Sequence, residues 1–309
     1  MTTTPDLNGY PYGAHLAALD VVEGISLCGS HRQGTADTLS DLDLWIVVRD
    51  DTPLSETYVL DHMLPANARQ EQLFEGRDDT LASHLVLNLL TGMGIVNLKV
   101  LRRQVLEQFV QDARPSLDEQ FLEDLENYAT MRPLHDPCGV LATHQQHLTD
   151  TYVTTAGQWL TPLLLQRYAS LYWRSVYQGL LRSEPHSWRH LMGLLLNLLA
   201  SQDAVNAGHL PPPAKWLMSP RIHTPSKPGL TGLQDQVAAV SPADHRQVVA
   251  VYESLARVEC AVWGQAPLPH GLWWHQVFTH RLPNLAHGSD NSYLRRLLAE
   301  LPDPFREAR

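Results

Sequence analysis

Residues 28–48 decide the fold: Cys28-Gly-Ser-His-Arg-Gln-Gly-Thr-Ala-Asp-Thr-Leu-Ser-Asp-Leu-Asp-Leu-Trp-Ile-Val-Val48. The short apolar stretch 24–28 predicts a strand. Gly29 then lets the backbone turn sharply and approach a ligand closely. Ser30 adds a hydroxyl and an N–H group that can hold phosphate oxygens. The stretch therefore predicts a strand, a phosphate-binding turn and, after a spacer, a second strand.

Two carboxylates stand at the head of that second strand. Asp41 and Asp43 lie two residues apart beside the apolar run Leu42–Val48, so both side chains point to one face. Like charges side by side repel unless a cation lies between them. Hard carboxylate oxygens select Mg²⁺. A phosphate-binding turn beside a two-carboxylate metal site is the apparatus of phosphoryl or nucleotidyl transfer.

The composition is that of a soluble globular protein with room for two domains. The chain has 309 residues, of which 44% are hydrophobic and 18% charged, and its formal net charge is −10. This acidic balance argues against a broad nucleic-acid-binding surface. It favours a small or cationic acceptor or a protein partner, and a homo-oligomer stays open. Cysteines are few, the N-terminus lacks signal-peptide features and no apolar run spans a membrane, so we expect a cytoplasmic protein.

Two β-type runs, 83–90 and 95–101, flank the glycine-containing loop Thr91-Gly-Met-Gly94 and predict a hairpin. The other elements expected before residue 140 are helices and one last short strand, at 10–22, 51–80 (a helix followed by irregular chain), 103–112, 117–128 and 131–139. This part of the chain is expected to be a mixed-sheet domain.

From residue 140 the pattern becomes helical. Helices are expected at 141–157, 161–183, 187–206, 242–263 and 291–300. A Pro-, Ser- and Gly-rich stretch over 219–229 predicts a loop between them. The expected fold is therefore α/β (α+β), with a mixed-sheet domain over residues 1–139 followed by an all-α helical-bundle domain over 140–309.

The turn and the acidic strand together resemble the signature of the DNA polymerase β-like nucleotidyltransferase superfamily. The matching residues are Gly29-Ser30, the spacer and Ser40-Asp41-Leu42-Asp43-Leu44. The minimal nucleotidyltransferases and the aminoglycoside or lincosamide nucleotidyltransferases are the most similar branches. The resemblance implies that Asp41 and Asp43 hold a catalytic Mg²⁺, with Gly29, Ser30 and Ser40 at the nucleotide. The alternative without a function is an ordinary turn followed by a strand that begins with acidic residues.

In that family a third carboxylate stands on a neighbouring strand after a hairpin. The matching position in Val96-Asn97-Leu98-Lys99-Val100 is Asn97, whose amide cannot accept a proton at neutral pH. Asn97 is otherwise a polar residue on an open strand face. Three explanations compete: a shifted register, a base from the helical domain, or a weakened or inactive enzyme. The alternative carboxylates are Asp61, Glu75, Asp78 and Asp79 in the first domain and Glu253 and Glu259 in the second.

Lysine is rare, and two of the three lysines are candidate site residues. Lys99 shares a strand face with Asn97, so it could pair with Asp41 or Asp43 or contact a phosphate. Lys215 lies in Pro212-Pro-Ala-Lys-Trp216, which resembles the segment where adenylyltransferases of the family place a lysine against the β- and γ-phosphates. The ordinary alternative for Lys215 is a solvated side chain at a loop-to-helix junction.

The resemblance implies a Mg²⁺-dependent transferase that moves a nucleoside monophosphate, most simply AMP from ATP, to a hydroxyl of a small-molecule acceptor such as an antibiotic. Asp41, Asp43 and Asn97 would be its catalytic residues. A protein or tRNA acceptor, as in toxin–antitoxin members of the superfamily, stays open. The main alternative is a protein that keeps the fold without turnover and binds nucleotide or a partner as a regulatory or toxin–antitoxin module.

Overall fold

The chain folds into two compact units, and each is described by itself. The computed structural model describes residues 7–76, 84–176, 185–212, 217, 229–241 and 244–264. The first unit, called the sheet unit below, comprises Met1–Arg114 and Glu123–Val153. The second, called the helical unit, comprises Pro115–Leu122 and Thr154–Arg309.

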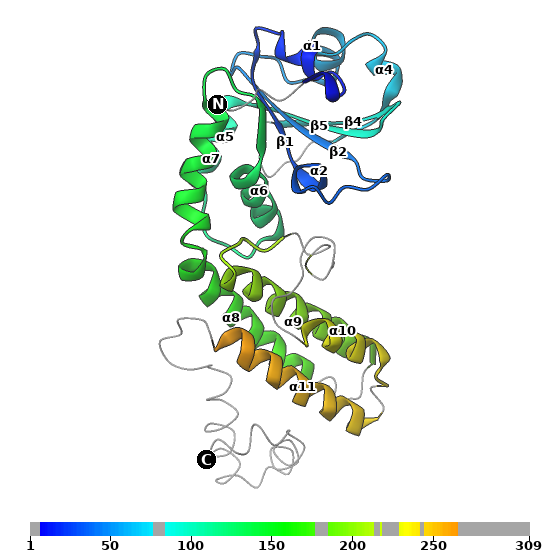
Figure 1. Ribbon diagram of the computed structural model, residues 1–309, viewed down its shortest axis with the longest axis vertical. Coiled ribbons are helices and arrows are strands. Elements are labelled where there is room, and N and C mark those ends of the chain that lie inside the picture. The colour runs from blue at the N-terminus through cyan, green and yellow to red at the C-terminus, as the bar shows by residue number, and fades with distance from the viewer. Residues whose placement is uncertain are drawn as a thin grey trace. The chain divides into compact units, whose positions relative to one another are not determined.

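Six strands form one mixed sheet, which confirms the expected α+β class. They are β1 (Val22–Leu27), β2 (Leu42–Val48), β3 (Gln72–Gly76), β4 (His84–Thr91), β5 (Gly94–Arg102) and β6 (Arg132–His135). Their order is β3-β4-β5-β2-β1-β6 (Figure 1). Among these strands β2 and β5 run parallel, and the other neighbouring pairs are antiparallel. The predicted hairpin is therefore confirmed as β4 and β5.

One face of the sheet carries an apolar core. Leu44 and Ile46 of β2 and Leu98 of β5 are fully buried there. Short helical segments supply the other side of this core, and they are α1 (Gly13–Ala17), α3 (Glu56–Tyr58), the π-helical turn η2 (Val59–Met63) and α4 (Ala68–Glu71). Each fully buried Leu or Ile stabilises the fold by about 1.5–3 kcal/mol. Because side chains alternate along a strand, this burial sends Asp43 and Asn97 to the opposite face.

Longer helices lie on that opposite face. They are α5 (Arg103–Asp112), α6 (Glu119–Thr130) and α7 (Val140–Leu148). The Tyr128 ring packs between Trp45 and Phe109, with centroid distances of 4.6 and 4.7 Å. Leu141 of α7 fits against Gly24, where an added Cβ would lie 2.8 Å from its side chain. The sheet unit therefore includes α7, beyond the expected boundary between residues 139 and 140.

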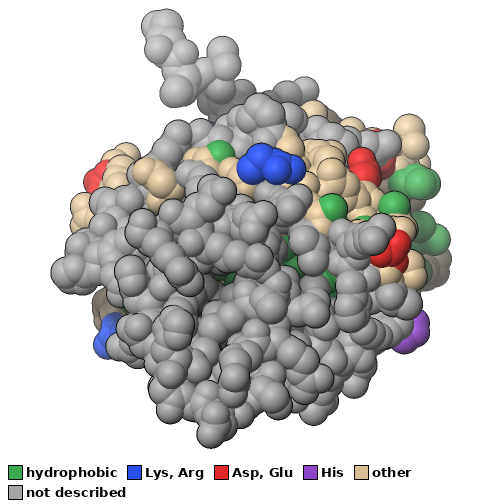
Figure 2. Space-filling model, turned by 90° about the horizontal axis from the view of Figure 1, so that it is seen from below, with side chains coloured by type: hydrophobic (Ala, Val, Ile, Leu, Met, Phe, Trp, Pro, Cys, Tyr) green, Lys and Arg blue, Asp and Glu red, His purple; other side chains and the backbone are tan. Residues whose placement is uncertain are grey.

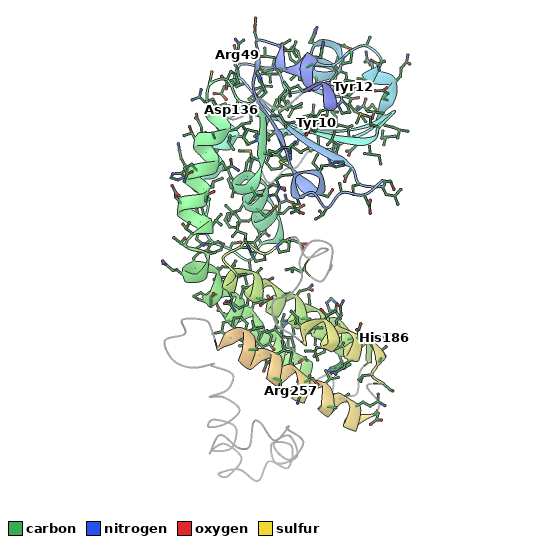
Figure 3. All side chains as sticks on the ribbon, viewed as in Figure 1. Tyr10, Tyr12, Arg49, Asp136, His186 and Arg257 are labelled. Carbon is green, nitrogen blue, oxygen red and sulfur yellow. The ribbon has the colours of Figure 1, made fainter. Side chains whose placement is uncertain are left out.

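Carboxylates that follow two strands cap two of these helices. Asp50, after β2, accepts a hydrogen bond from the Gln104 N–H of α5 at 2.7 Å. Asp136, after β6, accepts from the N–H groups of Leu141 at 3.2 Å and Ala142 at 2.9 Å, at the start of α7 (Figure 3). Such caps are worth about 1 kcal/mol each. They fix where α5 and α7 begin relative to the sheet.

The predicted helix over 10–22 is wrong beyond its first turns. The segment holds the 3₁₀ turn η1 (Leu7–Gly9) and then α1, which ends at Ala17. The N–H groups of Leu19 and Val22 bond three residues back, to Leu16 and Leu19, so the chain continues through tight turns into β1. Strand pairing with β2 begins at Val22 and outweighs the helical spacing of the apolar residues. Strand β3, in the stretch expected to be helical and irregular, was not predicted.

Four helices make up the described part of the helical unit, apart from the short Pro115–Leu122 segment. They are α8 (Ala156–Val176), α9 (Pro185–Asn206), α10 (Leu230–Ala239) and α11 (His245–Trp263). The expected helix over 141–157 is instead α7 followed by the π-helical turn η4 (Thr149–Val153). Helix α10 was not expected, and the predicted helix over 291–300 lies outside the described residues.

The core of the helical unit is rich in aromatic rings. Tyr168, Tyr172, Trp188, Tyr252 and Trp263 are all buried. No described helix is both long and apolar enough to cross a bilayer. On the face drawn in Figure 2, the described Lys and Arg side chains stand singly and do not gather into a patch.

Candidate active site

Strand register places Asp43 and Asn97 side by side. In the parallel pair β2–β5, Asp43 is aligned with Asn97, and in the antiparallel pair β4–β5, Asn97 is aligned with Asn88. Aligned residues on neighbouring strands present their side chains to the same face. One carboxylate and two amides therefore form a row across three strands, and exposed Asp41 directly precedes β2.

The Gly29-Ser30 turn lies directly against Asp43. Gly29 has φ +61°, and a Cβ at this position would lie 2.1 Å from the Oδ2 atom of Asp43. The N–H of Cys28 also donates to the backbone oxygen of Asp43 at 3.0 Å. Glycine is thus required twice at position 29, for its backbone conformation and for its lack of a side chain. The predicted turn takes the form of the short helix α2 (Gly29–Gln33).

Arg32 ties α2 to α6, a connection that sequence reasoning missed. Its guanidinium donates to the Glu126 carboxylate at 2.6 Å and to the Thr130 backbone oxygen at 3.1 Å. Both ionised side chains are mostly buried, and charge-assisted hydrogen bonds of this kind are stronger than neutral ones. The tether holds the turn in place beside Asp43. The one sequence feature that could have indicated this contact is the presence of a charged residue, Arg32, within residues 28–48.

Lys99 pairs with Asp124 of α6, a partner that the sequence did not indicate. The Lys99 Nζ atom lies 3.2 Å from the Asp124 carboxylate and 4.4 Å from the centre of the Trp45 ring. Both charged side chains are buried. Because Lys99 follows Asn97 by two residues, this ion pair lies one step along the same face from the row.

Ser40 is held by a turn of its own loop. Its hydroxyl donates to the Asp37 carboxylate at 3.1 Å and accepts from the Asp37 N–H at 2.9 Å. The Leu39 N–H donates to the same carboxylate at 3.0 Å. The turn fixes the path of the chain into Asp41, whereas the expected contact of Ser40 with nucleotide stays a prediction.

Burial keeps the neighbouring thiol of Cys28 inert. Desolvation raises the pKa of Cys28, and the negative charge of nearby Asp43 raises it further. A thiol held neutral in this way is a poor nucleophile. The site therefore offers carboxylate, amide and hydroxyl groups, and no reactive thiolate at neutral pH.

The alternative carboxylates are placed as follows. Asp61 lies on η2, over the opposite face, and pairs with Arg69 at 3.0 Å. Glu75 lies on β3, aligned with Leu87 and separated from β5 by β4. Glu259 is fully buried in the core of the helical unit, where it accepts a hydrogen bond from Tyr168. Asp78, Asp79 and Lys215 lie outside the described residues, as does the side chain of Glu253.

The donor set at Asp41 and Asp43 fits Mg²⁺. This ion is usually bound by one or two carboxylates together with substrate phosphates and retained water. No cluster of three potential His, Cys, Asp or Glu ligands occurs among the described residues, so substrate oxygens would have to complete the coordination. The Asp43 Oδ2 atom occupies the space that a side chain at position 29 would need, so only glycine lets this carboxylate lie against the turn, and Asn97 could add a neutral oxygen.

Comparison with known proteins adds a distant likeness. No family model and no curated protein sequence matches the chain. Among solved structures, the chain is similar to a nucleotidyltransferase-like protein from Exiguobacterium sibiricum 255-15, with 13% identity, a TM-score of 0.39, and coverage of 82% of this chain and 74% of that one.

Proposed function

We propose that the protein is a Mg²⁺-dependent nucleotidyltransferase that transfers a nucleoside monophosphate, most simply AMP from ATP, to the hydroxyl of an acceptor. The single observation that carries the proposal is the placement of Asp43. Its carboxylate lies against Gly29 of the turn and its strand position is aligned with Asn97. A metal-binding carboxylate, a phosphate-binding turn and an amide thus converge from three segments of the chain.

Each side chain then has a definite task. Asp41 and Asp43 hold Mg²⁺, which when bound neutralises charge on the phosphates. The Ser30 hydroxyl and the neighbouring N–H groups orient the triphosphate. Asn97 holds the acceptor hydroxyl by a hydrogen bond. The acceptor oxygen bonds to the α-phosphorus as the bond to pyrophosphate breaks, and its proton passes to water because an amide cannot take it.

Replacement of both aspartates is expected to abolish transfer. With labelled ATP, Mg²⁺ and a panel of hydroxyl acceptors, Asp41→Ala/Asp43→Ala should lower pyrophosphate release at least about 100-fold, because metal ions stabilise charge by several kcal/mol in such reactions. Asp51→Ala removes an exposed aspartate that pairs with Arg49 and should leave the rate unchanged. Release that survives the double substitution would disprove the mechanism.

Restoring a carboxylate beside Asp43 is expected to strengthen metal binding. In Asn97→Asp the new charge faces Asp43, so we expect about tenfold tighter Mg²⁺ binding and a roughly 2–4 °C larger rise in Tm on adding MgCl₂. Gln111→Glu adds the same charge at an exposed position of α5 and should respond to MgCl₂ as the native chain does. An equal rise in Tm for Asn97→Asp and Gln111→Glu would mean that position 97 does not face the metal.

Asn97 also favours a second candidate function, binding of nucleotide without turnover. Without a general base at this position, the same residues hold Mg²⁺ and the triphosphate but do not activate the acceptor. The two functions differ in one measurement. Calorimetric binding of MgATP with no pyrophosphate release over the acceptor panel would support the binding protein, as a regulatory or toxin–antitoxin module requires.

A further inference from the structure

The β4–β5 hairpin exposes apolar side chains at the end of the candidate site. Leu90 and Ile95 are aligned with each other and are 53% and 41% exposed. Their strand neighbours Leu89 and Val96 point to the other face and are buried. Leu90 and Ile95 therefore stand on the face that carries Asp43 and the two amides.

Leu90 and Ile95 lie directly beside the row formed by Asp43, Asn97 and Asn88. Asn88 precedes Leu90 by two residues and Asn97 follows Ile95 by two, so two amides and two apolar side chains form one block on β4 and β5. The hairpin end is held by hydrogen bonds of Thr91, which donates to the Gly94 oxygen at 2.9 Å and accepts from the Met93 N–H at 3.1 Å. The block is thus supported by an ordered turn.

The chemistry of this block determines what it can bind. Neither β4 nor β5 contains an acidic residue, and Asp41 and Asp43 are taken by the metal in the proposed function. On β4 and β5 a polycationic acceptor would therefore find no carboxylate. An apolar ring or alkyl group, in contrast, gains stability from covering Leu90 and Ile95, and the partly exposed amide of Asn97 can bind its hydroxyl.

The size of the block argues against a protein partner. Leu90, Ile95 and Met93 are partly exposed side chains at one hairpin end, whereas a stable protein interface buries about 800 Å² on each partner. We infer that this block is the acceptor subsite and that the acceptor is an uncharged small molecule with an apolar ring or alkyl portion beside its hydroxyl. Its role as an acceptor site rests on the proposed function, whereas the chemistry of its ligand follows from the residues of the block.

Binding of 2-naphthol, a fluorescent aromatic alcohol, to the full chain without nucleotide tests this inference. Leu90→Thr/Ile95→Thr keeps β-branched residues suited to strands and should weaken binding about tenfold or more by removing apolar contact. The matched control is Val21→Thr, a partly exposed position bonded to Arg49 at the far end of β2, and its affinity should equal that of the native chain.

Three outcomes would overturn the inference: equal 2-naphthol binding by the double variant and the native chain, displacement of 2-naphthol by spermine, or a loss of binding that accompanies dissociation of a dimer on size-exclusion chromatography. Calorimetry with MgATP on the same samples tests the proposed function separately. No MgATP binding together with naphthol binding that depends on Leu90 and Ile95 would remove the transferase and keep the apolar subsite. The reverse result would remove the subsite alone.

Discussion

Lys99→Met is expected to destabilise the sheet unit by about 3–5 kcal/mol, because it leaves the Asp124 carboxylate buried without its counter-charge. The Lys99 and Asp124 side chains are 10% and 4% exposed and lie 3.2 Å apart. Methionine retains most of the apolar stem that covers Trp45. The loss should therefore come from the uncompensated charge, and urea unfolding would measure it.

The double variant Lys99→Met/Asp124→Leu tests whether the loss comes from one unpaired buried charge or from the removal of the ion pair itself. Removing both charges should recover most of the lost free energy of unfolding, because a buried ion pair is often no more stable than apolar residues of similar volume. Arg103→Met breaks an exposed ion pair with Glu107 at 2.8 Å on α5 and should cost less than about 1 kcal/mol. A Lys99→Met effect as small as that of Arg103→Met would contradict this account.

The same variants distinguish a structural lysine from a phosphate-binding one. If Lys99 only stabilises the sheet next to Asn97 through its ion pair with Asp124, the double variant should regain both the stability of the native chain and its MgATP affinity. If Lys99 contacts a phosphate, as the sequence suggested, the affinity should stay low in the double variant. Calorimetry with MgATP on the stable double variant decides between the two.

Local patterns were sufficient to predict the strands that carry the site. β2, β4 and β5 each contain apolar residues at alternating positions, and a short glycine-containing loop joins the last two, so period and turn chemistry agree. These elements are confirmed. The helix over 10–22 failed because its apolar spacing also suits a short helix followed by a strand, and pairing with β2 decides between them.

Contacts between distant parts of the chain could not be predicted in this way. Asp124 and Glu126 lie in the stretch 117–128, for which only a helix was expected, yet one neutralises Lys99 and the other holds Arg32 beside the turn. Neither pairing leaves a signal in local spacing, because the partners are 25 and 94 residues apart. Register is a similar case. Only the family resemblance indicated Asn97, because local spacing does not give the register of β2 against β5, and β3 and β4 separate these two strands in the sequence.

Glu259 is expected to make the helical unit less stable as the pH rises. Its carboxyl is fully buried between aromatic residues, and burial raises its pKa from 4.5 to about 8, partly offset by the hydrogen bond from Tyr168. Between these two values the folded chain keeps a proton that the unfolded chain releases. The free energy of unfolding therefore falls as the pH rises from about 4.5 to 8, by roughly 5 kcal/mol in all.

The described tyrosines around Glu259 do not titrate in this range. Burial raises the pKa values of Tyr168, Tyr172 and Tyr252 above their usual range, so these phenols stay neutral. The Oε2 atom of Glu259 has no hydrogen-bond partner among the described residues, which leaves an ionised carboxylate poorly compensated. The pH dependence should therefore belong to the single carboxyl of Glu259.

Glu259→Gln removes the titrating group and keeps an oxygen that can accept from Tyr168. Urea unfolding followed by fluorescence of buried Trp188 and Trp263 should then show a stability that hardly changes between pH 5 and 8, and a variant more stable than the native chain at pH 8. Asp235→Asn, at an exposed position of α10, should retain the native pH dependence. Equal slopes for Glu259→Gln and the native chain would mean that Glu259 ionises in the folded core as readily as in the unfolded chain, and the aromatic core would then have to admit water to its carboxylate.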